Sequence, residues 1–200
     1  ADVLEVARGM GLDRRIGTHF LKPGIGFGGS CFPKDVSALK QLAGNSGYHF
    51  QLLTAVIEVN ELQKRRVIGK LQKHLGSLVG KSVTLLGLAF KANTDDMREA
   101  SSLVLAARLQ ADGASVRAYD PVAETEARKL MASVQFADNA LDAVTDADAC
   151  VIVTEWPEFA ALDWVAVAER MRGNLVIDGR NFADPDAVRA AGFIYEGIGR

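Results

Sequence analysis

Long apolar runs, an excess of one charge and a cysteine framework are all missing from this sequence, and each absence excludes a class of protein. No apolar segment approaches the roughly 20 residues of a membrane-spanning helix, so we expect no membrane association. The formal net charge is −2 with the two signs interspersed, which argues against a nucleic-acid partner. The two cysteines, Cys31 and Cys150, lie far apart in unlike surroundings. This favours a reducing compartment, and the cytoplasm is the expectation.

Metal ligands and hydrolase signatures are also missing. His19, His49 and His74 each stand alone, with no second ligand at metal-binding spacing, so we expect no metal site. No Gly-x-Ser-x-Gly turn is present. The chemistry must therefore come from other side chains.

The pattern of the chain changes near residues 76–81 and predicts an α/β protein of two parts. We expect residues 1–79 to form a helical part and residues 80–200 a Rossmann-like, doubly wound parallel-sheet domain. A helical pattern from Phe50 to Leu75 would extend roughly 40 Å at about 1.5 Å per residue. Such a helix suits a spine between domains or a subunit interface, although a helix within one core is the alternative.

Strands and helices are expected to alternate after Gly80. Short apolar runs predict buried parallel strands, and the segments between them have helical periodicity. The predicted strands are residues 82–88, 115–119, 149–154 and 175–177, and the predicted helices are residues 100–111, 123–131, 140–145 and 162–171.

The first residues read as the middle of a helix. The segment 2–8 has an amphipathic pattern with no capping residue before it. We therefore expect a fragment whose N-terminal portion is missing.

The turn after the first predicted strand is long and polar. It lacks the Gly-x-Gly-x-x-Gly sequence that lets a backbone approach a pyrophosphate, but it carries Lys91 and Arg98. Two cations at the carboxyl end of a strand suit an anionic ligand such as a nucleotide phosphate. Alternatively, they pair with Asp95, Asp96 or Glu99 as solvated loop charges, and the pattern does not decide between these two interpretations.

The glycine-rich segment 26–35 contains the sharper signal. Pro33 favours the start of a helix running to about Ala43, which places Cys31 just ahead of the helix N-terminus, where the helix dipole favours a thiolate. Lys34 adds positive charge, and Asp35 can cap backbone N–H groups or hold a water or general base near the sulfur. A lone cysteine is more often a small buried apolar residue, which describes Cys150 better than Cys31.

Together these segments resemble the UDP-glucose/GDP-mannose dehydrogenase family over essentially the whole chain. The run from Gly26 to Asp35 is similar to that family's active-site cysteine motif, and the run from Phe90 to Glu99 to its nucleotide-binding turn. The segments 176–181 and 197–200 match as well. The resemblance implies a three-part enzyme with an N-terminal NAD-binding domain, a central helical domain and a C-terminal UDP-binding domain. This chain would begin late in the central domain.

The implied reaction is the four-electron oxidation of a sugar C6 alcohol to a carboxylate with two NAD. The resemblance assigns the nucleophile to Cys31 and the handling of water to Asp35. It assigns NAD contacts to Lys34 and Arg98. It assigns substrate contacts to Arg15, which would reach a partner subunit's site, and to Phe20, Leu21, Lys22, Phe27, Gly28, Phe32, Phe90, Lys91 and Arg180.

The family also uses a lysine, an asparagine and a glutamate-bearing segment upstream of the cysteine, which this chain does not contain. We therefore expect the parent protein to be a dehydrogenase and this chain alone to show no turnover. A homodimer or higher homo-oligomer would form through residues 50–75. The segments 155–159 and 178–181 favour UDP-glucose as substrate. The alternatives are GDP-mannose or UDP-N-acetylmannosamine dehydrogenase chemistry, a non-catalytic nucleotide-sugar-binding and dimerisation module, or a redox switch.

Overall fold

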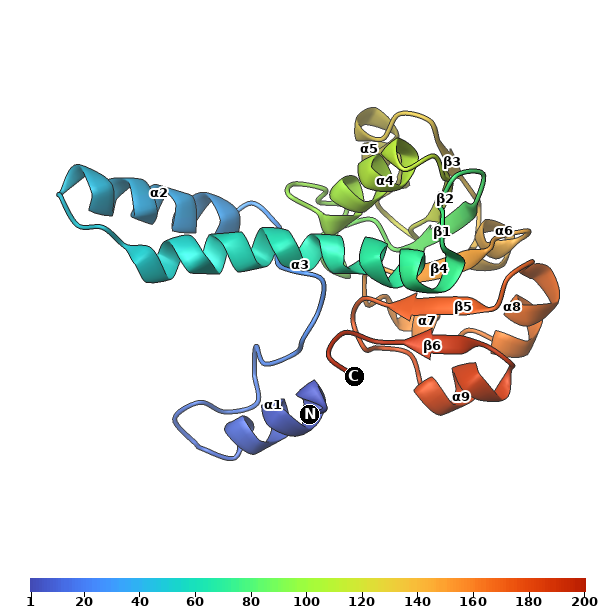
Figure 1. Cartoon of the computed structure of the whole chain (residues 1–200), viewed down its shortest axis with the longest axis horizontal. Coiled ribbons are helices and arrows are strands. Elements are labelled where there is room, and N and C mark those ends of the chain that lie inside the picture. Colours follow the sequence, from blue (N-terminus) through green and yellow to red (C-terminus); the bar gives the residue numbers. More distant parts are fainter.

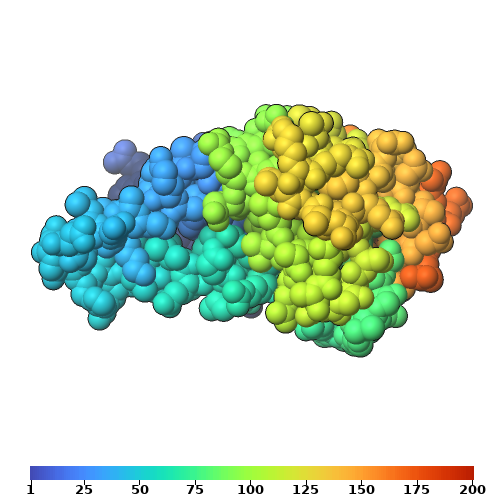
Figure 2. All heavy atoms as spheres, turned by 90° about the horizontal axis from the view of Figure 1, so that it is seen from above, coloured from blue at the N-terminus to red at the C-terminus, as the bar shows by residue number.

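The computed structural model describes all 200 residues and has two parts, an α-helical arm and an α/β domain (Figure 1). The arm consists of α2 (Phe32–Asn45) and the first half of α3 (Gln51–Leu75). The short helix α1 (Val3–Gly11) and the loop after it lie on one side of the arm. The space-filling view shows the arm meeting the α/β domain at the segment around residues 90–100 (Figure 2).

Six parallel strands form the sheet, in the order β3-β2-β1-β4-β5-β6. This is the doubly wound order, in which the strand sequence reverses between β1 and β4. The predicted fold class is therefore confirmed. The strands are β1 (Ser82–Leu86), β2 (Ser115–Tyr119), β3 (Val134–Phe136), β4 (Ala149–Ile152), β5 (Leu175–Asp178) and β6 (Ile194–Glu196).

Helices cover both faces of the sheet, because alternate residues of each buried strand point to opposite sides. On β4, Ala149 and Val151 join the core under α3, α4 and α5, whereas Cys150 and Ile152 join the core under α6 to α9. These helices are α4 (Ser101–Ala111), α5 (Glu124–Leu130), α6 (Ala140–Val144), α7 (Pro157–Ala160), α8 (Trp164–Arg170) and α9 (Pro185–Ala190).

Helix α3 has two different halves. Its C-terminal half is part of the core through Val67, Ile68 and Leu71. Its N-terminal half leaves Leu52 and Val59 exposed beside α2. The core interpretation thus describes the C-terminal half of this helix, and the use of its N-terminal half as a spine or a subunit interface stays a prediction. No helix in the structure is both long enough and apolar enough to span a bilayer.

The expectation that the first helix lacks a cap is wrong. Asp2 is the N-cap of α1, and its carboxylate accepts a hydrogen bond from the Leu4 N–H at 2.8 Å. The same segment contacts the other end of the chain: Val3 N donates to Gly199 O, and Arg200 Nε lies 3.1 Å from Asp2 Oδ2. The sequence pattern includes Asp2 in the helix because the apolar positions of the helical pattern begin directly after it, at Val3.

Candidate active site

Cys31 occupies the N-cap position of α2, and its side chain is exposed. Cys31 therefore lies at the positive end of a 14-residue helix. The Ser30 hydroxyl is 3.7 Å from the sulfur. No side chain caps α2, so Asp35 does not serve as a cap, and Lys34 Nζ lies 3.4 Å from an Asp35 oxygen.

The cysteine loop, residues 24–31, is pressed against the turn between β1 and α4. Gly29 N donates to Arg98 O at 2.8 Å. A Cβ on Gly28 would overlap the Glu99 carbonyl oxygen, and one on Gly29, which has φ +88°, would lie 2.7 Å from the Phe90 ring. Gly28 is needed because the two backbones approach this closely, and Gly29 because of its positive φ and the nearby Phe90 ring.

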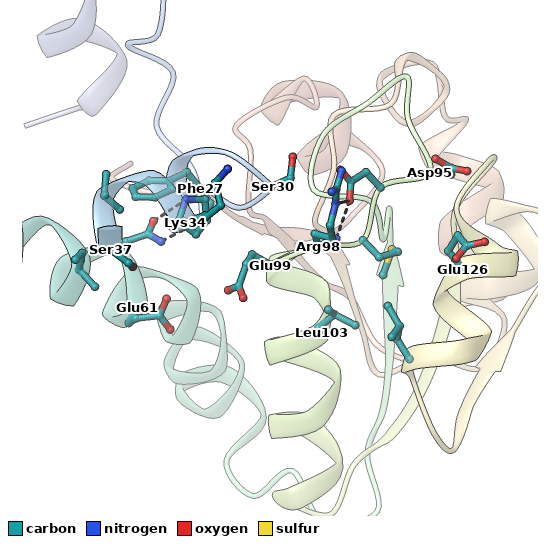
Figure 3. Close-up of a pocket in the computed structure, with 18 residues that line it drawn as sticks. Phe27, Ser30, Lys34, Ser37, Glu61, Asp95, Arg98, Glu99, Leu103 and Glu126 are labelled. Atoms are coloured by element: carbon teal, nitrogen blue, oxygen red, sulfur yellow. Dashed lines mark hydrogen bonds and ion pairs between the residues drawn. The ribbon is translucent and has the colours of Figure 1, made fainter. Parts of the chain in front are cut away.

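A cleft of about 1030 Å³ opens where the arm meets this turn. Figure 3 shows Phe27, Lys34 and Glu61 on the arm side, Arg98 and Asp95 on the side of the α/β domain, and Ser30 between them. Cys31 itself does not line this cleft, but its sulfur lies 3.7 Å from the hydroxyl of Ser30, which does.

A second cleft of about 870 Å³ lies on the other side of Phe27. Five residues that were expected to bind substrate line it together: Phe20, Lys22, Phe27, Phe32 and Arg180. The two clefts share Phe27, Val36 and Asn60 as a common wall. The candidate site thus consists of two clefts, with the Phe27 side chain in the wall between them.

The two cations of the turn behave differently. Arg98 pairs with Asp96 at 2.7 Å, as the loop-charge interpretation had it, yet it also lines the first cleft. The Asp96 carboxylate raises the pKa of Arg98, mainly through the hydrogen bond between the two side chains. Lys91 lies 5.3 Å from the centre of the Phe90 ring and has no carboxylate partner, so it remains available to an anion.

Arg180 connects three segments at the carboxyl edge of the sheet. Its Nε donates to Val153 O at 2.8 Å and lies 3.2 Å from a Glu155 oxygen, and its Nη2 donates to Phe90 O at 3.2 Å. The guanidinium also lies against Gly24 of the cysteine loop. These segments follow β1, β4 and β5, beside the point where the strand order reverses and ligands of such folds bind.

Comparison with known proteins places this geometry in a family. Residues 84–185 match the UDP binding domain of the UDP-glucose/GDP-mannose dehydrogenase family, and residues 1–62 match its central domain. The chain belongs to this family.

Individual relatives agree with that assignment. UDP-glucose 6-dehydrogenase TuaD of Bacillus subtilis is 48% identical over 100% of this chain, which covers 44% of that protein. A solved UDP-glucose dehydrogenase from Pyrobaculum islandicum has a TM-score of 0.88 at 38% identity, and a UDP-D-ManNAc dehydrogenase from Pyrococcus horikoshii has 0.81 at 32%. Both alignments cover 100% of this chain and 44% of the other. The chain therefore spans less than half the length of these relatives. The division at residues 79 and 80 lies between the two matched ranges and stays a prediction.

About half of the residues that the family resemblance assigned to the site line one of the two clefts. Lys34 and Arg98 share the first cleft, and at the junction behind it Gly28 lies against Glu99 and Gly29 lies against the Phe90 ring. Seven of the expected residues line neither cleft: Cys31, Asp35, Gly28, Phe90, Lys91, Leu21 and Arg15. Of these, Leu21 is half-buried, and Arg15 pairs with Asp13 at 2.6 Å on the exposed loop after α1. No cluster of side chains suited to a metal ion is present.

Sequence reasoning missed four polar residues around the site. Asn60 and Lys64 of α3 are buried behind the cysteine loop, Glu155 lies against Arg180, and Asp120 accepts hydrogen bonds behind the turn. For Asn60 a signal existed: it is an uncharged polar residue within the apolar part of the predicted spine helix.

Proposed function

We propose that this chain is the nucleophile-bearing and UDP-binding part of an NAD-dependent nucleotide-sugar 6-dehydrogenase that converts UDP-glucose to UDP-glucuronate. One observation carries the proposal: the exposed sulfur of Cys31, at the N-terminus of α2, lies 3.7 Å from the hydroxyl of Ser30, which lines a cleft together with Arg98 and Lys34. Such a setting can bring an anionic ligand close to a nucleophilic sulfur.

Covalent catalysis by Cys31 fits the aldehyde stage of the reaction. The thiolate would add to C6, forming a C–S bond while the carbonyl electron pair moves to oxygen, which takes up a proton to give a thiohemiacetal. Loss of hydride from C6 and of the hydroxyl proton leaves a thioester. Water then adds to the thioester and expels the thiolate, releasing the carboxylate and two protons. Asp35, in the first turn of α2, would orient that water.

NAD, when bound, accepts the hydrides removed from C6. The residues of this chain fit a limited part in holding it: Lys34 and Arg98 place two exposed cations on the walls of the first cleft, suited to a pyrophosphate. The β1–α4 turn has no dinucleotide-binding glycines. We therefore propose that the main NAD-binding domain lies outside this chain and that the chain alone does not turn over.

UDP-glucose is the preferred substrate because the similarity to UDP-glucose dehydrogenases is higher than to the UDP-D-ManNAc dehydrogenase, 48% and 38% against 32%. Phe20, Lys22 and Phe32 of the second cleft, with Arg180, would hold the sugar nucleotide next to Cys31.

The arm would pair two copies of the protein. Leu52, Val56, Val59 and Leu62 are exposed on α3, and Leu39 and Leu42 on α2. Exposed apolar side chains gathered on two adjacent helices are typical of a homo-oligomer interface.

Thiol labelling tests the proposal. Iodoacetamide at neutral pH should alkylate Cys31 rapidly and spare Cys150, because burial raises the pKa of the Cys150 thiol. UDP-glucose should slow labelling of Cys31 at least fivefold, and the chain should form no NADH from UDP-glucose and NAD. A Cys31 that labels as slowly as Cys150, or without any effect of UDP-glucose, would refute the proposed function. NADH formation would refute the proposed inactivity of the chain.

A further inference from the structure

The side chain of Asn60 makes two hydrogen bonds to the main chain of one residue in the cysteine loop. Its Oδ1 accepts from Phe27 N at 2.8 Å, and its Nδ2 donates to Phe27 O at 3.1 Å. Asn60 is only 8% exposed, so both bonds are shielded from water. Unmaking a bond of this kind would leave a buried polar group without a partner.

The loop between Phe27 and Cys31 needs such support. Gly28, Gly29 and Ser30 separate these residues, and Gly26, with φ +92°, comes just before. Glycines lose more conformational freedom on ordering than other residues, so this segment does not define its own shape. Its middle is held by Gly29 N on Arg98 O, and its start is held by Asn60.

Because Phe27 contacts the residue next to Cys31, fixing the main chain of Phe27 also restricts the position of Cys31. The Phe27 ring packs edge-on against the ring of Phe32, with centroids 5.9 Å apart, and Phe32 is the residue after Cys31. Phe27 is also part of the wall between the two clefts. Asn60 therefore sets both the location of the sulfur and the shape of the space in front of it.

Only an amide side chain can do this at position 60. The Phe27 main chain requires one acceptor and one donor from the same side chain, which Asn supplies and Asp does not. Gly26 permits the approach, since a Cβ there would lie 2.9 Å from Asn60 Oδ1. One turn further along α3, the buried Lys64 bonds to Glu61 at 2.7 Å and lies 3.9 Å from Glu99, which ties the helix to the β1–α4 turn.

We propose that Asn60 is a positioning residue that holds the Cys31 sulfur over the sugar of a nucleotide bound at the α/β domain. The inference rests on the proposed function. It assigns to Asn60 no contact with substrate, because both of its polar atoms already bond to Phe27.

Protection of Cys31 from iodoacetamide by UDP-glucose tests the inference in the 200-residue chain. Two quantities come from a titration: the concentration giving half-protection, which reports binding, and the maximal protection factor, which reports how closely the sulfur faces the ligand. The variants are Asn60→Ala and Asn60→Asp. Asn139→Ala is the matched control, because Asn139 also accepts from a main-chain N–H, that of Asp142, but at the start of α6.

Asn60→Ala should reduce the maximal protection to below twofold and change the half-protecting concentration less than threefold. Asn60→Asp should fall between Asn60→Ala and wild type, because a carboxylate still accepts from Phe27 N. Asn139→Ala should match wild type. Unchanged maximal protection in Asn60→Asp, or in a folded Asn60→Ala, would overturn the inference. A tenfold rise in the half-protecting concentration at unchanged maximum would also overturn it, since Asn60 would then be a binding residue. Absence of protection in the wild-type chain would instead refute the proposed function, and this inference with it.

Discussion

Three basic side chains at the end of α3 converge on a single carboxylate, that of Glu196 on β6. Lys70 and Lys73 donate to it at 2.6 and 2.5 Å, and His74 Nε2 lies 2.6 Å away. The Glu196 side chain is only 15% exposed. This cluster fastens the spine helix to the edge of the sheet, so replacing Glu196 should destabilise the fold in a pH-dependent manner.

The size of the effect follows from the pKa of Glu196. Burial alone would raise this pKa, but the hydrogen bonds from Lys70, Lys73 and His74 outweigh burial and lower it from 4.5 to about 2. A shift of that size corresponds to at most about 3 kcal/mol of folding free energy. Lys73 is 67% exposed and solvent screens its charge, which leaves about 1–2 kcal/mol. Because the folded-state pKa is lowered, this stability is complete above pH 4.5 and is lost as the pH falls toward 2.

Urea unfolding of wild type and Glu196→Gln, followed by circular dichroism at several pH values, measures the difference. We expect a gap of about 1–2 kcal/mol at pH 7 that shrinks to less than about half of that value near pH 3. Asp186→Asn is the control: its carboxylate is 94% exposed and 3.5 Å from Arg189, so its gap should stay near zero throughout. An equal gap for Glu196→Gln at pH 7 and pH 3 would refute the reasoning, because the loss would then come from packing and not from charge.

Two further substitutions test backbone geometry and a buried charge. Gly29→Ala should lower the free energy of unfolding by about 1–3 kcal/mol, because φ is +88° and the new Cβ would meet the Phe90 ring. Gly69→Ala should raise it by about 0.5–1 kcal/mol, because Gly69 lies within α3 and has open space around its Cα. Thermal unfolding of the pair shows whether the signs are opposite; equal signs would contradict the argument. Asp120→Asn should lower the free energy of unfolding in urea by about 1.5–3 kcal/mol, because the Asp120 carboxylate accepts hydrogen bonds from four main-chain N–H groups and from the Trp156 indole. A loss below about 0.5 kcal/mol would contradict this explanation.

The buried strands were predictable from sequence and the edge strands were not. The strands at Ser82, Ser115, Ala149 and Leu175 begin where the apolar runs predict, and three of them, β1, β4 and β5, are buried on both faces. Strands β3 and β6 were missed. Each has three residues, stands at an edge of the sheet and is partly exposed, so it contains no apolar run.

The site shows the same limit. The exposure of Cys31 at a helix start followed from local signals, namely Pro33 and the glycines before it. The hydrogen bonds that hold the cysteine loop join residues 33 or more positions apart, such as Asn60 and Phe27. No local sequence pattern predicts them. The same limit applies to Arg98, whose pairing with Asp96 was one of two open interpretations until the turn was seen as a whole.

Asp120 occupies the main-chain N–H groups that follow β1 in this domain. The N–H groups that follow β1 are the ones that would face a pyrophosphate in such a fold. Here the N–H groups of Leu88 and Ala89 donate to Asp120 Oδ2 at 2.6 and 3.1 Å, and the other carboxylate oxygen accepts from Val122 and Ala123. The protein's own buried carboxylate thus takes the place of an external anion. The turn beyond Leu88 extends toward the arm, where Phe90 and Arg98 contact Gly29 of the cysteine loop. The residues that would bind the nucleotide therefore lie next to the loop that carries the proposed nucleophile.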